Sequence, residues 1–219
     1  MSPPELSLRD VSVSIKGKSI LQGINLNLEK GEHMALTGPS GSGKSSLLKV
    51  VMGVLPVSSG HVEIEGQALS SKTVFALRQK IAYIDQSSAM GAESVEDALM
   101  LPYTFKAMQD KEPNREELLH YLDLLAFDKK ILHEKCSVLS GGQQQRLSLI
   151  RALLLKRPLI LADEVTASLD AENKERVMDL LQNCQASILS ISHDKEWIER
   201  CPKTLVLNSG EIVSGEGDG

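Results

Sequence analysis

The stretch from Leu36 to Lys49, LTGPSGSGKSSLLK, sets the strictest requirement on the fold of this chain. It contains the pattern G-x-x-x-x-G-K-[ST], with Gly38, Gly43, Lys44 and Ser45 at the fixed positions. An apolar run precedes the pattern and helically spaced leucines follow it, which predicts a strand, a tight turn and a helix. Glycines let backbone N–H groups point toward one centre, and the helix adds the positive end of its dipole. The sequence therefore predicts a phosphate-binding loop.

The residues of this loop have separate expected contacts with a nucleotide. We expect Lys44 to reach the β- and γ-phosphates and the Ser45 hydroxyl to bind Mg²⁺. The other expected nucleotide contacts come from the rest of the loop: Gly38, Pro39, Ser40, Gly41, Ser42, Gly43 and Ser46. The alternative is a flexible Gly/Ser loop with a chance lysine, and it leaves the flanking strand and helix patterns unexplained.

Composition narrows the class of protein. With 219 residues, of which 42% are hydrophobic, the chain predicts one large α/β domain with an ample core. The formal net charge of −5 argues against a nucleic-acid partner, because such binders usually present a basic face. No run approaches eighteen apolar residues, and the N-terminus has no secretion signal. The three cysteines, Cys136, Cys184 and Cys201, read as ordinary thiols of a reducing compartment, so we expect a cytoplasmic protein.

The hydrophobic patterns divide the chain into a core and an insert. Alternating residues before the loop predict antiparallel strands, and a slip of phase between Leu8 and Val11 predicts a bulge in the first one. A helix is predicted from about Gly43 to Val54. Residues 1–86 and 156–219 are expected to form the core, and residues from about 87 to 155 a helical subdomain. Within that subdomain, Ser94 and Asn114 are the expected helix caps.

Two acidic residues follow a predicted buried strand in the segment PLILADE. Asp163 ends the apolar run, and open α/β sheets bind ligands at the carboxyl ends of their strands. A carboxylate there can hold Mg²⁺ through water, so we expect Asp163 to be a metal residue. Within a strand, Glu164 would point away from Asp163, free to polarise a water that attacks the γ-phosphate. The alternative is a pair of acids that solvates a turn.

The segment LSGGQQQR, Leu139 to Arg146, lies upstream of LILADE and resembles the signature sequence of ATP-binding cassette (ABC) ATPases. Further motifs follow in the family's order: Gln86 matches the Q-loop glutamine, Ser168-Leu169-Asp170 the D-loop and His193 the switch histidine. The resemblance covers essentially the whole chain. It implies an α/β fold, in which a P-loop NTPase core carries an N-terminal antiparallel β subdomain and an inserted α-helical subdomain. It also implies ATP hydrolysis with ATP and Mg²⁺.

The resemblance implies a role for each matched residue. Glu164, His193 and Gln86 become the expected catalytic residues, and Gln86 is also expected to sense the metal. The signature is expected to complete the nucleotide site of a second copy of the chain, in a head-to-tail dimer, through Ser140, Gly141, Gly142 and Gln143. Asp170 is expected to act across the dimer interface, although on its own it would be interpreted as a turn residue or a helix cap.

The sequence departs from the family pattern at two positions. The family usually places an aromatic residue after the first strand, where it stacks on adenine, and the alignment puts Ile15 there. An aliphatic side chain packs on the base without π-stacking, so adenine selectivity is expected to be weaker. Val165 replaces the usual proline after the catalytic glutamate, which is expected to alter a turn and not the chemistry.

Finer features, such as SVEDALMLPYTFK and SHDKEW, are similar to the ATPases of bacterial iron-export transporters. The expected partner is therefore a separate integral membrane permease, which holds the chain at the inner face of the cell membrane. Lipoprotein-release, macrolide-export and amino-acid-uptake ATPases are the alternatives, as is a regulatory or mechanical module without transport. A soluble cassette acting on ribosomes or DNA usually carries two cassettes, a coiled coil or zinc cysteines, and the sequence contains none of these.

Overall fold

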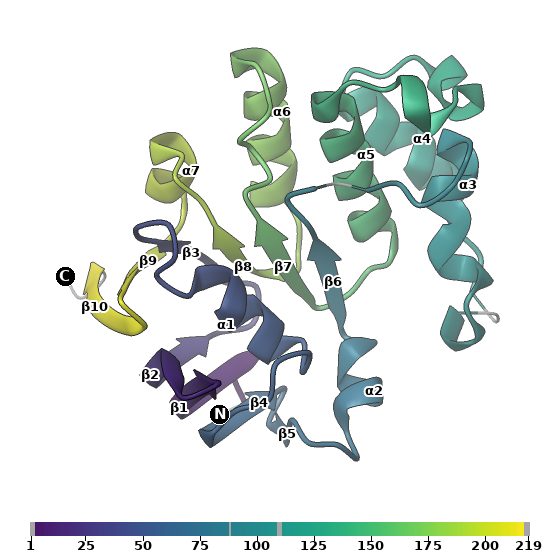
Figure 1. Ribbon diagram of the computed structural model, residues 1–219. Coiled ribbons are helices and arrows are strands. Elements are labelled where there is room, and N and C mark those ends of the chain that lie inside the picture. Colours follow the sequence, from purple (N-terminus) through teal and green to yellow (C-terminus); the bar gives the residue numbers. More distant parts are fainter. Residues whose placement is uncertain (1–2, 88, 109–110, 217–219) are drawn as a thin grey trace.

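The computed structural model describes residues 3–87, 89–108 and 111–216. Figure 1 shows two sheets side by side, with helix α1 (Lys44–Val51) between them and a group of helices to one side. This is the P-loop core with an antiparallel β subdomain and an inserted helical subdomain, so the predicted fold class is confirmed.

The smaller sheet is antiparallel and has four strands. Its order is β2 (Lys18–Leu28), β1 (Leu6–Ile15), β4 (Ser59–Ile64), β5 (Gln67–Ala68). The pairing of β1 with β2 shifts register between Leu8 and Val11, where Asp10 has a positive φ of 51°. The phase slip in the sequence is therefore a β-bulge, as predicted.

The larger sheet carries the phosphate-binding loop. Its order is β10 (Glu211–Glu216), β9 (Lys203–Asn208), β3 (His33–Thr37), β8 (Ser187–Ile191), β7 (Leu159–Asp163), β6 (Ile81–Ile84). All neighbours pair in parallel except β10 with β9. Parallel strands end at the same edge, so the segments after β3, β6, β7 and β8 meet there.

The helices cover both faces of the larger sheet. The remaining α-helices are α2 (Val74–Arg78), α3 (Val95–Met100), α4 (Arg115–Leu124), α5 (Gly141–Leu154), α6 (Ala171–Gln182) and α7 (Lys195–Arg200). Short 3₁₀ turns are η1 (Leu101–Thr104), η2 (Lys106–Met108), η3 (Lys129–His133) and η4 (Cys136–Val138). Both predicted caps are confirmed: Ser94 accepts a hydrogen bond from the Asp97 N–H, and Asn114 accepts one from the Glu117 N–H.

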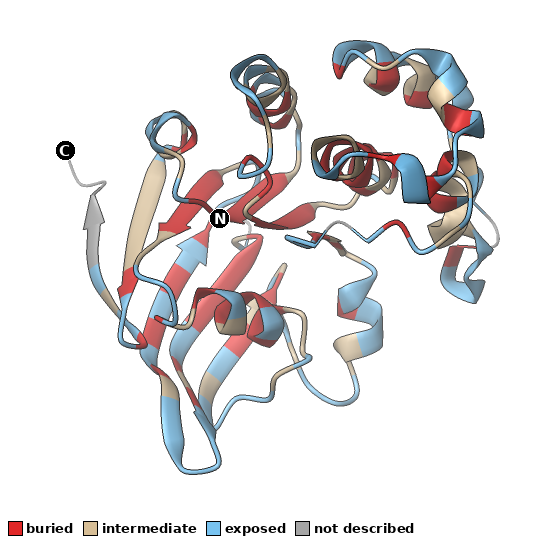
Figure 2. Ribbon diagram, turned by 45° about the horizontal axis from the view of Figure 1, so that its top comes forward, coloured by how far each residue is buried: buried red, intermediate tan, exposed pale blue. Residues whose placement is uncertain are grey.

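Buried residues form one apolar core on each face of the larger sheet (Figure 2). Alternate residues of β7 serve the two cores, because successive side chains of a strand point to opposite faces. Leu159 and Leu161 pack with α1 and the antiparallel sheet, whereas Ile160 and Ala162 pack with α5 to α7. The strand is buried on both sides, which explains its continuous apolar sequence.

Helix α1 is shorter than the predicted span of Gly43 to Val54. It ends at Val51, and Gly53 then adopts a left-handed φ of 64°. At this end of the helix, the Arg78 guanidinium donates hydrogen bonds to the carbonyl oxygens of Met52 and Gly53, at 2.8 and 3.0 Å. A glycine just past the last turn is a common helix stop, and here a tertiary contact reinforces it.

Gly60 in β4 offers a direct test of the packing in the antiparallel sheet. Its φ is 83°, and an added Cβ would lie 2.2 Å from the Asp10 carbonyl oxygen. Gly17 is the matched control, because its φ of 79° is similar and a Cβ there would meet no atom within 4 Å. We expect Gly60→Ala to lower the free energy of unfolding by about 3 kcal/mol and Gly17→Ala by about 1 kcal/mol. Denaturant melts of both variants measure this, and equal losses would contradict the steric explanation.

The longest helix of the described chain is too short to cross a membrane. Helix α5 has 14 residues, and a span requires about 20 apolar ones. Within the described ranges, no helix combines the length and apolar character that a membrane crossing requires.

Candidate nucleotide-binding site

The phosphate-binding loop runs from β3 to α1 at the carboxyl edge of the larger sheet. Gly43 is the N-cap of α1 and has a left-handed φ of 109°. The buried Lys44 side chain bends back over the loop, where Nζ donates hydrogen bonds to the carbonyl oxygens of Gly38 and Pro39, at 2.7 and 3.0 Å. The first N–H groups of a helix have no partner within it. The loop therefore places a cation next to free N–H donors, as an anion site requires.

Packing makes glycine necessary at two positions of this loop. A Cβ on Gly38 would lie 1.9 Å from the carbonyl oxygen of Leu207 in β9. A Cβ on Gly43 would lie 2.9 Å from the Leu21 side chain and 3.0 Å from the Ile20 carbonyl oxygen in β2. Strands from both sheets thus press against the loop from outside, while its other side stays open.

A pocket of about 370 Å³ lies against this loop. It collects most of the predicted site residues, from four separate segments of the chain. The lining residues are Ile20, Ser40, Gly41, Gly43, Lys44, Ser45, Ser46, Gln86, Asp163, Glu164, Ile191 and His193. Gly38, Pro39 and Ser42 belong to the same loop but do not line the pocket. The topology therefore brings the phosphate loop together with the residues that follow β6, β7 and β8.

Asp163 is a buried carboxylate at the end of β7. Burial raises its pKa; a hydrogen bond with Ser45 opposes this rise, and the nearby Glu164 and Asp85 carboxylates add to it. Crowded, partly desolvated carboxylates next to a hydroxyl suit a bound cation. Among the described residues, no three His, Cys, Asp or Glu side chains are placed to hold a metal. Mg²⁺ does not need them, because it usually takes one or two carboxylates together with phosphate oxygens and water.

Glu164 does not have the strand geometry that the sequence predicts. Strand β7 ends at Asp163, and Glu164 has a left-handed φ of 53°, so the predicted alternation of the two side chains is wrong. Two hydrogen bonds accompany this turn: the Glu164 N–H donates to the Ile191 carbonyl at 3.0 Å, and Gln145 Nε2 donates to the Glu164 carbonyl at 2.7 Å. A non-glycine residue in this conformation costs about 1–3 kcal/mol, and such residues cluster at functional sites.

Gln86 and His193 converge on the Glu164 carboxylate from the two neighbouring strands. Gln86 Nε2 donates a hydrogen bond to Glu164 Oε2 at 2.8 Å. His193 Nε2 lies 3.8 Å from the other oxygen, Oε1. Both carboxylate oxygens therefore face groups that the sequence places far apart. The Gln86 amide oxygen is left for another partner, such as a metal or a water.

The predicted signature residues lie outside this pocket. Ser140 caps α5 in a capping box, in which its Oγ accepts from the Gln143 N–H at 3.3 Å and its N–H donates to Gln143 Oε1 at 2.8 Å. Ser140 and Gly141 are exposed, and a Cβ on Gly141 would meet no atom within 4 Å. The start of α5 is thus open to a ligand from outside and does not contribute to the pocket of its own chain.

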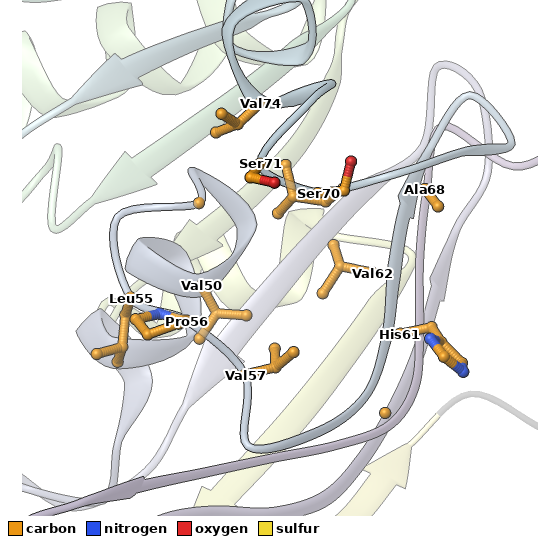
Figure 3. Close-up of a pocket in the computed structure, with 13 residues that line it drawn as sticks. Val50, Leu55, Pro56, Val57, His61, Val62, Ala68, Ser70, Ser71 and Val74 are labelled. Atoms are coloured by element: carbon orange, nitrogen blue, oxygen red, sulfur yellow. The ribbon is translucent and has the colours of Figure 1, made fainter.

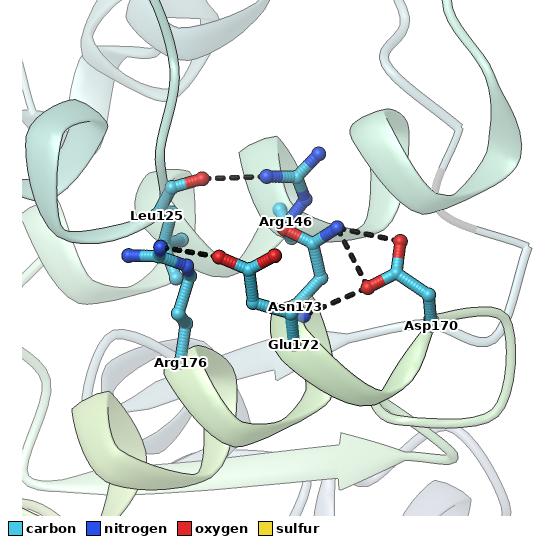
Figure 4. Close-up of polar contacts among 6 residues, drawn as sticks. All are labelled: Leu125, Arg146, Asp170, Glu172, Asn173 and Arg176. Atoms are coloured by element: carbon cyan, nitrogen blue, oxygen red, sulfur yellow. Dashed lines mark hydrogen bonds and ion pairs between the residues drawn. The ribbon is translucent and has the colours of Figure 1, made fainter.

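The signature and the D-loop pack against each other. A Cβ on Gly142 would lie 3.1 Å from the carbonyl oxygen of Ser168. Asp170 caps α6, accepting hydrogen bonds from the N–H and the side-chain amide of Asn173 (Figure 4), and these bonds hold its pKa below the usual range. The helix-cap interpretation of Asp170 is confirmed, and its action across an interface stays a prediction.

Arg146 fixes the signature helix to the turn after α4, within the helical subdomain. Its guanidinium donates a hydrogen bond to the Leu125 carbonyl (Figure 4) and lies 4.3 Å from the centre of the Phe127 ring. Burial lowers the pKa of Arg146, and the nearby Asp170 carboxylate opposes that effect. The start of α5 is therefore held between the D-loop and the turn after α4.

The residue predicted to contact adenine is not among those that line the pocket. Ile15 ends β1, is 42% exposed and does not line the pocket, whereas Ile20 in β2 does. Sequence reasoning missed Ile20, and it missed Gln145, whose amide holds the Glu164 backbone. No motif marks Ile20. Gln145 lies inside the LSGGQQQR segment, so its position in the signature was the available signal.

A second hollow of about 370 Å³ lies behind α1 and lacks the features of a phosphate site (Figure 3). Its walls come from the end of α1, the β4–β5 hairpin and the start of α2, and they are mainly aliphatic, with Val50, Leu55, Val62 and Val74 among them. It contains no lysine or arginine. The pocket against the loop, and not this hollow, is therefore the candidate nucleotide site.

Comparisons with known proteins agree with this geometry. The ABC transporter family model matches residues 21–167. The probable iron export ATP-binding protein FetA of Escherichia coli (strain K12) is 33% identical, over 95% of this chain and 94% of that protein. The macrolide export ATP-binding/permease protein MacB of Campylobacter jejuni (serotype O:23/36, strain 81-176) is 35% identical over 94% of this chain, which spans only 33% of that protein.

A solved structure shows the same architecture. It is the ATP-binding cassette MJ0796, dimeric and bound to ADP and Pi in a post-hydrolysis state. The two structures superpose with a TM-score of 0.87 at 28% identity, over 98% of this chain and 99% of the other. The phosphate loop, the contacts of Gln86 and His193 with Glu164 and these likenesses lead to one conclusion. The chain belongs to the ABC transporter family, and it is an ATP-binding, ATP-hydrolysing cassette of that family.

Proposed function

We propose that Glu164 is the general base of ATP hydrolysis in this chain. The observation that carries the proposal is the convergence of Gln86 and His193 on its two carboxylate oxygens, at 2.8 and 3.8 Å, in the pocket that also contains Lys44. A water held by Glu164 Oε1 would lose its proton to that oxygen as it attacks. His193 would then face the γ-phosphate and the water together, and Gln86 would keep the carboxylate in its orientation.

The phosphate loop would bind the nucleotide and Asp163 the metal. Lys44 would exchange its two loop carbonyls for the β- and γ-phosphate oxygens, which are better partners for an ammonium group. Ser45, Asp163 and the Gln86 amide oxygen are the groups that would hold Mg²⁺. When bound, Mg²⁺ neutralises charge on the phosphate oxygens. The assignment of Asp163 is supported by its hydrogen bond with Ser45 and by its raised pKa.

We infer that two copies of the chain close over ATP in a head-to-tail dimer. Support comes from the start of α5, where Ser140 and Gly141 are exposed to solvent and lie outside the pocket of their own chain, with Gly142 next to them. Together with Gln143 they present an N-terminal helix turn, which favours an anion. The copy that supplies this turn would complete the site of the other copy. Two equivalent sites follow from two-fold symmetry.

We propose further that the cassette drives an integral membrane permease, which holds it at the inner face of the cell membrane. Large apolar side chains are exposed beyond α1: Val54 is 60% exposed and Phe75 is 74% exposed. Arg78 lies near both residues. It donates a hydrogen bond to the carbonyl of Gly53, the residue before Val54, and lies 6.0 Å from the Phe75 ring centre. Exposed apolar side chains that lie together favour a protein partner.

The proposed cargo is iron or another transition metal, exported from the cell. Its support is the likeness to the iron export ATP-binding protein, which extends over nearly the full length of both chains. The macrolide exporter is matched at similar identity but over only a third of its length, so macrolide export is the competing assignment. Lipoprotein release is a second competing assignment, because a lipoprotein-releasing system ATP-binding protein is 30% identical over 95% of this chain and 91% of that protein.

Reconstitution with the cognate permease tests this function. We expect proteoliposomes that contain both proteins and ATP to move Fe²⁺ across the membrane, and Glu164→Gln proteoliposomes to move none. An iron-sensitive fluorophore inside the vesicles measures the transport. If iron does not move while a macrolide stimulates ATP hydrolysis, the iron assignment is wrong and the macrolide assignment takes its place.

A further inference from the structure

The His193 side chain lies between two cavities and has little packing of its own. It lines the nucleotide pocket and also a neighbouring cavity of about 380 Å³, whose walls include Thr166, Leu169 and Lys174. The side chain is 53% exposed, and among the described residues its one ion-pair contact is the 3.8 Å approach to Glu164. Packing alone does not hold the ring where it meets Glu164.

The backbone after His193 is held by an ion pair. Asp194 Oδ2 lies 2.7 Å from Nζ of Lys174 in α6, and the two side chains are 11% and 27% exposed. The other oxygen, Oδ1, caps α7 by accepting from the Glu196 N–H at 3.1 Å. Burial would raise the pKa of Asp194, but the contacts with Lys174 and the backbone N–H bonds from Trp197 and Glu196 together outweigh it, and the pKa is lowered. Asp194 is therefore a charged link between the start of α7 and α6.

Helix α7 is also anchored to the larger sheet, through Trp197. This residue is 1% exposed, and its indole Nε1 donates a hydrogen bond to Ser190 Oγ in β8 at 2.8 Å. Ser190 Oγ in turn donates to the Met34 carbonyl in β3 at 3.2 Å. Trp197 thus fixes α7 in the core. The ion pairs of Arg200 with Glu175 and Asp179 join the end of α7 to α6. Lys174 holds the start of α7, next to His193.

We propose that Lys174 is a positioning residue for ATP hydrolysis, which holds His193 against Glu164 through its ion pair with Asp194. Without the Lys174 charge, Asp194 keeps its cap but loses its link to α6, and His193 gains freedom to enter the adjacent cavity. ATP binding depends on the phosphate loop, which Lys174 does not contact. The inference rests on the role proposed for His193. It assigns to α6, through Lys174, the task of holding His193 in place.

The test compares Lys174→Met, Lys174→Arg and the control Arg176→Met in the full-length protein. Arg176 lies on the same helix, but its 2.7 Å ion pair is with Glu172 of α6 itself, and neither residue lines the two cavities beside His193. We expect Lys174→Met to lower kcat about tenfold with the KM for ATP changed less than about twofold, because misplacing a catalytic group costs rate. Lys174→Arg should restore most of kcat, and Arg176→Met should match the wild type. Thermal melts verify that all variants are folded.

A double-mutant cycle with His193→Ala separates positioning from general structural damage. If Lys174 acts through His193, Lys174→Met lowers kcat no further in the His193→Ala background. An equal further loss in that background would overturn the positioning role. If His193→Ala lowers kcat and Lys174→Met does not, the positioning role is overturned while the proposed function stands. If His193→Ala keeps the wild-type kcat, the role of His193 fails and the inference fails with it.

Discussion

Glu164→Gln is expected to lower kcat for ATP hydrolysis by about 10²–10⁴-fold, because an amide cannot take the proton from the attacking water. Glutamine keeps the shape of glutamate, and its amide oxygen can still accept the hydrogen bond that Gln86 donates at 2.8 Å. The backbone bonds to Ile191 and Gln145 do not involve the side chain. We therefore expect ATP binding to persist, and the variant to accumulate as an ATP-bound dimer.

Phosphate release measures the first part of this result, calorimetry the second, and light scattering with ATP the third. Glu172→Gln is the matched control: it removes one carboxylate from an exposed position on α6, where the side chain is 79% exposed. This control should hydrolyse ATP at the wild-type rate. If Glu164→Gln also hydrolyses ATP normally, Glu164 is not the base. If hydrolysis is lost and ATP produces no dimer, the proposed assembly is wrong and the catalytic role remains.

Lys44→Ala is expected to weaken ATP binding about 100-fold, since a charge-assisted contact with phosphate contributes about 3 kcal/mol. The Lys44 ammonium group already lies within the loop, bonded to the carbonyl oxygens of Gly38 and Pro39. Its removal takes away the cation that faces the phosphates and also loosens the loop. Both effects raise the Kd for ATP.

Lys49→Ala is the control for this variant, because Lys49 is an exposed lysine in the last turn of the same helix. Calorimetric titration with ATP should give a wild-type Kd for Lys49→Ala and a raised Kd for Lys44→Ala. A thermal melt without nucleotide shows whether the Lys44 variant is folded. An unchanged Kd in a folded Lys44→Ala protein would refute the phosphate contact.

Much of the local structure could be predicted from short stretches of sequence. The bulge near Asp10, the caps at Ser94 and Asn114 and the strand before Asp163 all follow from neighbouring residues, because side-chain periodicity and capping act over a few positions. The fold class followed from the order of motifs along the chain. These features share one physical property, which is that their causes are local or are repeated along the sequence.

Other features could not be predicted because contacts distant in sequence produce them. Helix α1 stops at Val51 where Gly53 turns and Arg78, from another helix, bonds the chain. Glu164 leaves its strand geometry where Ile191 and Gln145 hold its backbone. Local patterns extend a helix or strand until a tertiary contact ends it, so the boundaries were less accurate than the elements.

By itself, the sequence predicted a phosphate-binding loop around Lys44 from residue type and spacing, and its resemblance to the ABC family implied the fold that the structure has. Only the tertiary structure decided which side chains meet. It placed Gln86 and His193 on Glu164, Ile20 rather than Ile15 in the pocket, and the signature outside it. The physical reason is the parallel sheet: it aligns the ends of strands whose separation along the chain says nothing about their distance in space.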